Sequence, residues 1–233
     1  FFYYDESSYF NIRVVGILED SRGPSDGKAP RHLRRLDLDA VVHGYVDIED
    51  PLYLHYAYEH IYSHIGNRVL QRHEAEGQSL RTLFIGGGAY TYPRYQKTIF
   101  PNVQCDISEI DPKVTVAVND AMGLADFPGD FNIVHSDARQ FIMQSERDAQ
   151  YDIIYGDAFS SLSVPSHLTT RTFTHDVARL LKPDGLYMIN MIDSWRAARF
   201  LSAFVNTLDE VFEHVHVFST LEGPLDDERA TFV

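Results

Sequence analysis

The chain of 233 residues is 44% hydrophobic, which is enough for one α/β domain with a small appendage around a buried core. Its formal net charge of -14, with 34 acidic residues against 20 Lys and Arg, argues against a nucleic-acid partner, because phosphate backbones need a basic surface. The single cysteine, Cys105, excludes an internal disulfide framework, and no apolar run is long enough to span a membrane, so we expect a cytoplasmic protein.

The two ends of the chain predict a fragment of a longer protein. The first residue is Phe1 rather than Met, and residues 230–233 have the pattern of the middle of a strand. Any targeting segment or membrane attachment would then belong to the absent parts.

Residues 1–50 predict a small antiparallel β-sheet domain. Short alternating runs at 9–15 and 34–42 flank a polar segment with Gly and Pro, which predicts a mobile loop over residues 20–30. From Pro51 the apolar residues recur at the i, i+3, i+4 spacing of an amphipathic helix that ends near Gly66. We expect residues 51–79 to form this connecting helix and a linker.

Strand-like and helix-like segments alternate from residue 80 to the end of the chain. Strands are predicted at 82–85, 104–109, 131–135, 151–155, 185–191 and 214–220. Helices are predicted at 92–99, 112–122, 138–145, 170–181 and 194–211. The alternation predicts a doubly wound, mostly parallel α/β sheet over residues 80–233, with ligands at the carboxyl ends of the strands.

The first of these strands ends in three glycines, Gly86, Gly87 and Gly88. Consecutive glycines let a backbone approach a ligand where any Cβ would collide, although a tight structural corner is the alternative. The spacing of the dinucleotide fingerprint is not completed, and no Lys-Ser or Lys-Thr pair follows, which argues against a pyrophosphate cofactor. Acids at the ends of the following strands favour a nucleoside-binding turn.

Two carboxylates close the second predicted strand on either side of Ile110. Glu109 lies where a bidentate acceptor can take two ribose hydroxyl hydrogen bonds, and a solvated loop acid is the alternative. Asp111 precedes Pro112, the arrangement of a helix N-cap, so we assign Asp111 to capping and Glu109 to ribose.

The next two strand ends also carry acids. Asp137, before Ala138, could accept a hydrogen bond from an adenine amino group or cap the following helix, and the two roles are compatible. Asp157 could bind a cationic amine or take its proton when the amine attacks carbon, and a capped turn is the alternative.

In this order, the motifs resemble the polyamine aminopropyltransferases, the spermidine synthase family. The resemblance is carried by Gly86–Gly88 and by the stretches 103–111, 136–142 and 151–157. Residues 36–43 resemble the family's Leu-Asp-Gly-x-x-Gln turn, and residues 50–60 resemble the Asp-Glu-x-x-Tyr-His-Glu start of its gate helix. The resemblance spans nearly the whole chain and is more specific for this family than for methyltransferases at large.

The resemblance implies a Rossmann fold like that of the class I S-adenosylmethionine-dependent methyltransferases. It further implies transfer of an aminopropyl group from decarboxylated S-adenosylmethionine to an amine such as putrescine, with release of methylthioadenosine. No metal is implied. Family members are commonly dimers or tetramers, so a homodimer or tetramer is expected.

The family pattern also assigns individual residues. It gives Glu109 to the ribose, Asp137 and Ala138 to the adenine, and Gly86, Gly87 and Gly88 to the sulfur side of the nucleoside, and it counts Ile110 among the cofactor-binding residues. Asp157 matches the acid that binds or deprotonates the amine. His43 stands where the family has a Gln that contacts the cofactor, and His55 stands at the gate-helix position near the amine.

Three positions depart from the family pattern. Ala89 replaces an Asp that helps to hold the amino group of the donor, Ser160 falls where a second Asp is expected, and Leu54 replaces the gate-helix Tyr. Two carboxylates that would neutralise cationic groups are thus missing, and an amine buried without a counter-charge is costly. Residues 164–170 resemble a variant branch, in which Ser160 and His167 could supply polar contacts to the substrate.

Two other functions stay open. Without an acid at Ala89 there is no repulsion against the carboxylate of intact S-adenosylmethionine, so methyl or aminocarboxypropyl transfer is the first alternative. The second is a non-catalytic nucleoside-binding domain that keeps the pocket without turnover.

Overall fold

A computed structural model describes residues 1–19, 30–146, 148–159, 164–193, 198–220 and 230–233. The loop expected at 20–30 therefore lies outside the described residues, apart from Pro30. The chain divides into two compact units. Unit 1 comprises residues 1–55, 88–101 and 111–130, and unit 2 comprises residues 56–87, 102–110 and 131–233. The predicted division at residues 50 and 79 stays a prediction.

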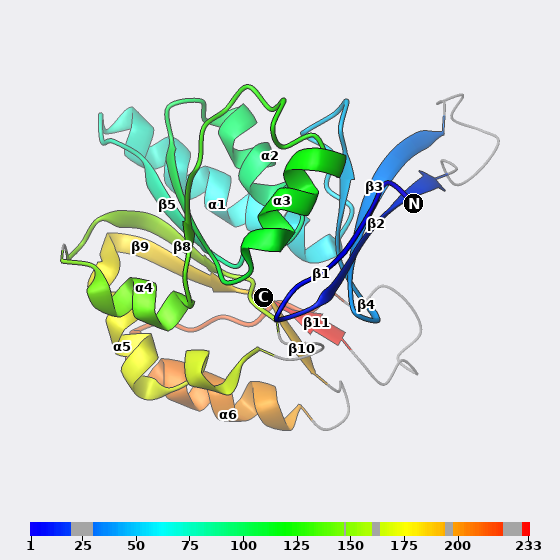
Figure 1. The fold of residues 1–233 in the computed structure, drawn as a ribbon. Coiled ribbons are helices and arrows are strands. Elements are labelled where there is room, and N and C mark those ends of the chain that lie inside the picture. The colour runs from blue at the N-terminus through cyan, green and yellow to red at the C-terminus, as the bar shows by residue number, and fades with distance from the viewer. Residues whose placement is uncertain (20–29, 147, 160–163, 194–197, 221–229) are drawn as a thin grey trace. The chain divides into compact units, whose positions relative to one another are not determined.

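Unit 1 contains a four-stranded antiparallel sheet in the order β1-β2-β3-β4 (Figure 1). Its strands are β1 (Tyr3–Glu6), β2 (Asn11–Glu19), β3 (Arg31–Leu38) and β4 (Val41–Asp47). Asp39 adopts a left-handed φ of 54° in the two-residue turn from β3 to β4, a conformation that Asp tolerates and tight hairpins require. The small N-terminal sheet expected from the alternating runs is confirmed.

Two helices complete unit 1. Helix α2 (Thr91–Ile99) packs beside β4, and α3 (Pro112–Ala121) packs on β1 and β2. The Asp111 side chain accepts a hydrogen bond from the Lys113 backbone N–H at 3.0 Å, with Pro112 as the first residue of α3. The predicted N-cap is confirmed, and its side chain satisfies one of the backbone donors that a helix start leaves unpaired.

Unit 2 contains a five-stranded parallel sheet in the order β7-β6-β5-β8-β9 (Figure 1). Its strands are β5 (Arg81–Ile85), β6 (Gln104–Glu109), β7 (Asn132–His135), β8 (Tyr151–Gly156) and β9 (Leu181–Ile189). The strand order reverses at β5, so the topological switch point lies between β5 and β8. This is the predicted α/β, Rossmann-like architecture.

Helices of unit 2 cover both faces of the parallel sheet. Helices α4 (Ala138–Gln144) and α5 (Arg171–Leu180) share a buried core with Leu83 and Ile154. Helix α1 (Ala57–Ala75) packs on the opposite face, where its Tyr62 contacts Tyr155 with ring centroids 5.1 Å apart. Burial on both faces explains why these strands read as continuous apolar runs in the sequence.

Two predicted boundaries are wrong. The helix expected to end near Gly66 continues to Ala75, because the buried stripe of α1 extends past Gly66 to Leu70 and His73. The strand expected at 214–220 is reduced to its last residues: Ser219 makes an isolated antiparallel bridge to Phe232, and the backbones of Phe218 and Thr220 hydrogen-bond to Val233 and Thr231. Most side chains in that segment are exposed, so its alternating polarity does not reflect a half-buried strand.

The end of the chain forms a smaller sheet. Strand β10 (Met191–Asp193) pairs antiparallel with β11 (Ala230–Phe232), with Met191 opposite Phe232. Helix α6 (Arg199–Asp209) packs beside β10 and begins later than predicted; residues 194–197 lie outside the described part.

A buried carboxylate anchors the amino ends of the strands in unit 2. Asp152 is fully buried and accepts hydrogen bonds from the Arg81 backbone N–H at 2.6 Å and from Lys182 Nζ at 2.8 and 2.9 Å. Nδ1 of His73 lies 2.6 Å from Asp152 Oδ1. One side chain thereby connects α1, β5 and β9 to β8.

Candidate functional site

The glycine corner forms where β5 and β8 end side by side. Gly86 has a φ of +94°, and a Cβ on it would lie 2.7 Å from the backbone oxygen of Asp157. The Asp157 N–H donates to the Ile85 carbonyl at 3.0 Å, which holds the two strand ends together. Both the conformation and the space at this position require glycine.

The second strand end supplies a buried carboxylate to the same corner. The Gly87 N–H donates to Glu109 Oε2 at 2.9 Å, and Glu109 is only 6% exposed. The neighbouring Ile110 side chain is 37% exposed. Glu109 is therefore held as an oriented acceptor beside the glycines, and its ribose-binding role stays a prediction.

The structure brings together Asp137 and His167, which were predicted for different ligands. Asp137 Oδ1 accepts from the backbone N–H groups of Arg139 and Gln140 at the start of α4, which confirms the N-cap alternative. Its Oδ2 lies 2.9 Å from His167 Nε2 in a 3₁₀ turn (Ser166–Leu168). Ala138 is buried as the first residue of α4. The adenine contact of Asp137 and Ala138 stays a prediction.

Asp157 is held from both sides at the end of β8. The Tyr58 hydroxyl donates to its Oδ2 at 2.9 Å, and Asn190 Nδ2 donates to its Oδ1 at 2.9 Å. Burial raises the pKa of Asp157 above its ordinary value of 3.8, while the hydrogen bonds from Asn190 and Tyr58 act in the opposite direction. A carboxylate with a raised pKa is suited to accept a proton from a substrate.

Sequence reasoning missed Tyr58 and Asn190. Asn190 follows β9 as Asp157 follows β8, so the rule that ligands gather at the carboxyl ends of parallel strands could have found it. Tyr58 lies in the first turn of α1, and only the packing of that helix shows that its hydroxyl reaches Asp157. Burial raises the pKa of Tyr58 well above 10, so the hydroxyl stays a donor.

The carboxyl ends of all five parallel strands thus carry a polar group or a glycine. In sheet order these are Asp137 after β7, Glu109 on β6, Gly86–Gly87 after β5, Asp157 after β8 and Asn190 after β9. The row offers a close backbone approach, acceptors for hydroxyl or amino groups, and one proton acceptor. This chemistry suits a nucleoside with a reacting group beside Asp157.

Three predicted site residues, His43, His55 and Gly88, belong to unit 1. His43 lies on β4, and burial lowers its pKa to about 4, so the imidazole is neutral at pH 7. Its Nε2 is buried and has no hydrogen-bond partner among the described residues. A Cβ on Gly88 would lie 3.5 Å from the His43 carbonyl oxygen.

His55 is engaged within unit 1. Its Nδ1 lies 3.2 Å from the Tyr53 hydroxyl and 3.5 Å from a Glu19 carboxylate oxygen, and its ring contacts Tyr45 with centroids 3.9 Å apart and planes tilted by 36°. Burial lowers the pKa of His55, and Glu19 partly offsets this. The predicted amine contacts of His55 and His167 stay predictions, and Ser160 lies outside the described residues.

Comparison with known proteins shows what this chain is similar to. No protein-family model matches the chain. A probable polyamine aminopropyl transferase of Bifidobacterium longum is 29% identical over 109 residues, which is 47% of this chain and 23% of that protein. The polyamine aminopropyltransferase of Vibrio vulnificus is 34% identical over 112 residues, which is 47% of this chain and 37% of that protein. The matched segments span well under half of these relatives.

Solved structures show the same fold over a larger share of the chain. A probable spermidine synthase of Corynebacterium glutamicum superposes with a TM-score of 0.76 at 24% identity and covers 98% of this chain and 78% of its own. The chain has the fold of this spermidine synthase. A spermidine synthase in complex with the transition state analogue AdoDATO has a TM-score of 0.68 at 16% identity, with coverage of 99% and 71%. Human methyltransferase-like protein 13 in complex with SAH has a TM-score of 0.56 at 20% identity, with coverage of 75% and 80%.

Two of the residues that depart from the family pattern are built into the packing of unit 1. Ala89 is 3% exposed, and a Cβ on Gly44 would lie 2.6 Å from the Ala89 Cβ, so the residue rests directly against the backbone of β4. Leu54 is 5% exposed. The apolar residues at these positions are therefore fitted to their surroundings.

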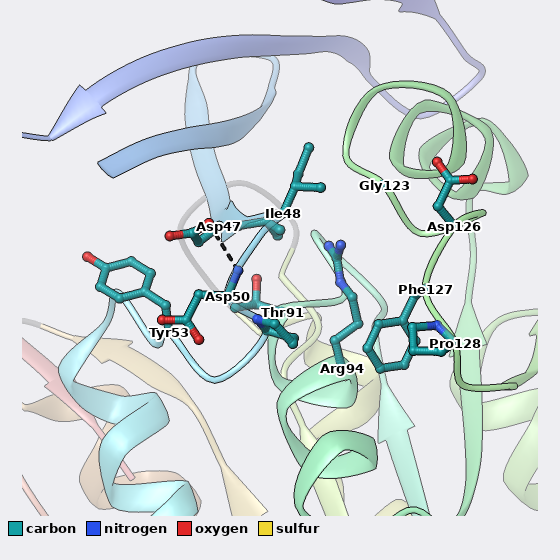
Figure 2. A pocket seen from close by; sticks show the side chains of 12 residues that line it. Asp47, Ile48, Asp50, Tyr53, Thr91, Arg94, Gly123, Asp126, Phe127 and Pro128 are labelled. Atoms are coloured by element: carbon teal, nitrogen blue, oxygen red, sulfur yellow. Dashed lines mark hydrogen bonds between the residues drawn. The ribbon is translucent and has the colours of Figure 1, made fainter. Parts of the chain in front are cut away.

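Unit 1 also contains a cavity of about 170 Å³ that none of the predicted site residues lines. Figure 2 shows Asp47, Asp50 and Tyr53 along one side and Arg94, Phe127 and Pro128 along the other. The positively charged side chain that lines this cavity, Arg94, is already hydrogen-bonded to the protein backbone. Its guanidinium donates to the carbonyls of Ala89, Tyr90 and Met122. Arg94 therefore fastens three backbone positions, and we assign this cavity no ligand.

The described residues contain no group of three or more His, Cys, Asp or Glu side chains able to hold a metal ion. They also include no helix with the length and apolar character needed to cross a membrane.

Proposed function

We propose that this chain transfers an aminopropyl group from decarboxylated S-adenosylmethionine to an amine and releases methylthioadenosine. The observation that carries the proposal is Asp157, a proton acceptor with a raised pKa held beside the glycine corner. The names of the two similar sequences, both polyamine aminopropyltransferases, support the same reaction. So does the spermidine synthase neighbour that binds AdoDATO.

The nucleoside would lie along the row of strand ends in unit 2. Glu109, with Ile110 beside it, would accept the two ribose hydroxyls, and Asp137 with Ala138 would contact the adenine. Gly86, Gly87, Gly88 and His43 would contact the sulfur side. The Gly87 N–H that holds Glu109 supports this assignment, because an oriented carboxylate binds a diol without a further loss of side-chain freedom.

The reaction needs a neutral amine and a fixed attack direction. The amine nitrogen forms a bond to the methylene carbon next to the sulfonium, and the carbon–sulfur bond breaks with its electron pair going to sulfur. Asp157 takes the proton that the nitrogen loses. Positioning and proton acceptance therefore provide the catalysis, without a covalent enzyme intermediate.

The remaining assignments concern the amine and the assembly. His55, His167 and Ser160 are proposed to contact a small amine such as putrescine, and a homodimer or tetramer is proposed for the protein. The contact of His167 with Asp137 supports a position for His167 near the row of strand ends. Light scattering coupled to size-exclusion chromatography would measure the assembly.

Donor binding and product formation test the proposal. Isothermal titration with methylthioadenosine, decarboxylated S-adenosylmethionine and intact S-adenosylmethionine should give the tightest binding for the decarboxylated donor or for methylthioadenosine. Product formation from a panel of amines should be lost in Asp157→Asn. Asp209→Asn, which changes an exposed acid at the end of α6, serves as the control and should retain activity.

One observation favours a second function. Ala89, buried against β4, leaves no acid to repel the carboxylate of intact S-adenosylmethionine, and one structural neighbour is a methyltransferase-like protein in complex with SAH. Tighter binding of the intact donor in the titration would replace the first proposal with methyl or aminocarboxypropyl transfer. Nucleoside binding without product from any donor and amine would instead support a non-catalytic domain.

A further inference from the structure

The two polar atoms of the Asn190 side-chain amide differ in hydrogen bonding: the nitrogen has a partner, and the oxygen has none among the described residues. Its Nδ2 donates to Asp157 Oδ1 at 2.9 Å, and the residue is only 4% exposed. Its Oδ1 is buried and accepts no hydrogen bond from any described residue. A buried amide oxygen without a donor costs free energy, so this acceptor is a place where a ligand N–H or O–H would be favourable.

The neighbouring carboxylate fixes the orientation of this amide. If the Asn190 amide were rotated by half a turn, its oxygen would face the ionised Asp157 and two acceptors would meet without a proton between them. The Tyr58 hydroxyl already donates to the other oxygen of Asp157. Asn190 therefore keeps its nitrogen on the carboxylate and its oxygen free for a donor from the ligand.

We propose that Asn190 Oδ1 accepts an N–H of the same substrate nitrogen that gives its proton to Asp157. The proposal rests on the proposed aminopropyl transfer. A neutral primary amine has two N–H groups, one for each acceptor, whereas a neutral secondary amine has only one. Asn190 thereby makes the site selective for primary amines, since a secondary amine leaves the buried Asn190 oxygen unpaired.

The experiment compares two substrates and two side chains. Wild type and Asn190→Leu, which has a similar volume and no polar atoms, are assayed with putrescine and with N,N′-dimethylputrescine, in which both nitrogens are secondary. Wild type should prefer putrescine in kcat/KM by roughly tenfold, the size of the penalty for leaving one buried acceptor without a donor. In Asn190→Leu most of this preference should disappear, because putrescine loses a contact that the dimethyl compound never makes.

Tyr58→Phe separates substrate binding from positioning of Asp157. This variant removes the other donor to Asp157 and leaves Asn190 Oδ1 in place. It should shift the pH profile while retaining the preference for putrescine over the dimethyl compound. If Asn190→Leu slows both substrates by the same factor, or if Tyr58→Phe removes the preference equally well, Asn190 only positions Asp157 and the proposal is overturned.

Binding measurements keep the proposal testable without turnover. The affinities of the two amines are measured by calorimetry on protein saturated with methylthioadenosine, and methylthioadenosine affinity and melting temperature report whether Asn190→Leu is folded. Absence of product with every amine in wild type would refute the proposed function alone. Equal effects of Asn190→Leu on the affinities of both amines would refute the Asn190 contact alone.

Discussion

Asp157 combines an environment that disfavours its charge with two donors that stabilise it. Burial raises its pKa, and the hydrogen bonds from Asn190 and Tyr58 lower it, with burial the larger effect. The side chain is consequently a stronger base than an exposed aspartate while its direction is fixed. Among the described residues, no other charged group contributes to this shift, so the two neutral donors are the means by which the fold adjusts its basicity.

This balance predicts the pH dependence of the proposed transfer. The proton acceptor must be ionised, so kcat/KM should fall as the pH decreases through the raised pKa of Asp157, at a pH above 3.8. Tyr58→Phe removes a hydrogen bond that lowers this pKa, so the acidic limb should move to higher pH. Initial rates against pH measure both effects, with the exposed Tyr4→Phe as control. A limb that moves to lower pH in Tyr58→Phe would contradict the assignment.

At the scale of elements, the corner between β5 and β8 depends on contact between two backbones. Gly86 touches the backbone of Asp157, so the position of the proposed proton acceptor is coupled to the glycine turn. The same turn presents Gly87 to Glu109. A change in the turn would thus disturb the proposed nucleoside contacts and the proposed amine contacts together.

Two glycine variants measure this coupling. Gly86→Ala combines a φ of +94° with a Cβ 2.7 Å from the Asp157 oxygen, so we expect at least tenfold weaker methylthioadenosine binding and loss of transfer. Gly77→Ala is the control, because Gly77 also has a positive φ, of +75°, but open space around it. It should cost about 1–2 kcal/mol of stability and leave the affinity unchanged. Equal affinities in both variants would show that the corner tolerates displacement.

At the scale of the whole molecule, unit 2 uses the two ends of its parallel sheet differently. At the amino ends, Asp152 has partners from three other elements and is closed to solvent. At the carboxyl ends, Asn190 keeps an acceptor that receives no hydrogen bond from the described part of the chain. Stability is thus concentrated at one end of the sheet, while the other end keeps hydrogen-bonding capacity for a ligand.

Removal of the buried carboxylate tests the stabilising role of the amino end. Asp152→Ala leaves Lys182 and His73 without their partner, and breaking a buried ion pair in this way typically costs about 3–5 kcal/mol. The control is Asp148→Ala, which breaks an exposed pair with Arg179 and should cost less than about 1 kcal/mol. Equilibrium unfolding in urea gives both values. Similar losses in the two variants would contradict the anchoring role.

The sequence allows prediction of features that depend on local pattern. Apolar runs in the sequence predict the buried strands, and the residues that end these runs are the glycines after β5 and the acids at the other strand ends. The Asp111 cap is predicted because a proline follows it at the start of α3. The end of α1 could not be predicted from Gly66, because a helix tolerates a glycine where its buried face continues. The Tyr58 contact depends on how α1 packs, and the segment 214–220 has the alternation of a strand but pairs only at its end.

Asp137 and Asp157 differ in what the fold would lose without them. Asp137 begins α4 and contacts His167, so a descendant that no longer performed chemistry would still be under selection to retain it. The ionised Asp157 opposes folding at neutral pH, because its pKa is raised in the folded chain, and this opposition vanishes below the ordinary value of 3.8. Relaxed selection would therefore erase Asp157 first. If Asp157 is the proton acceptor that we propose, its presence distinguishes active from inactive sequences of this type, whereas the presence of Asp137 does not.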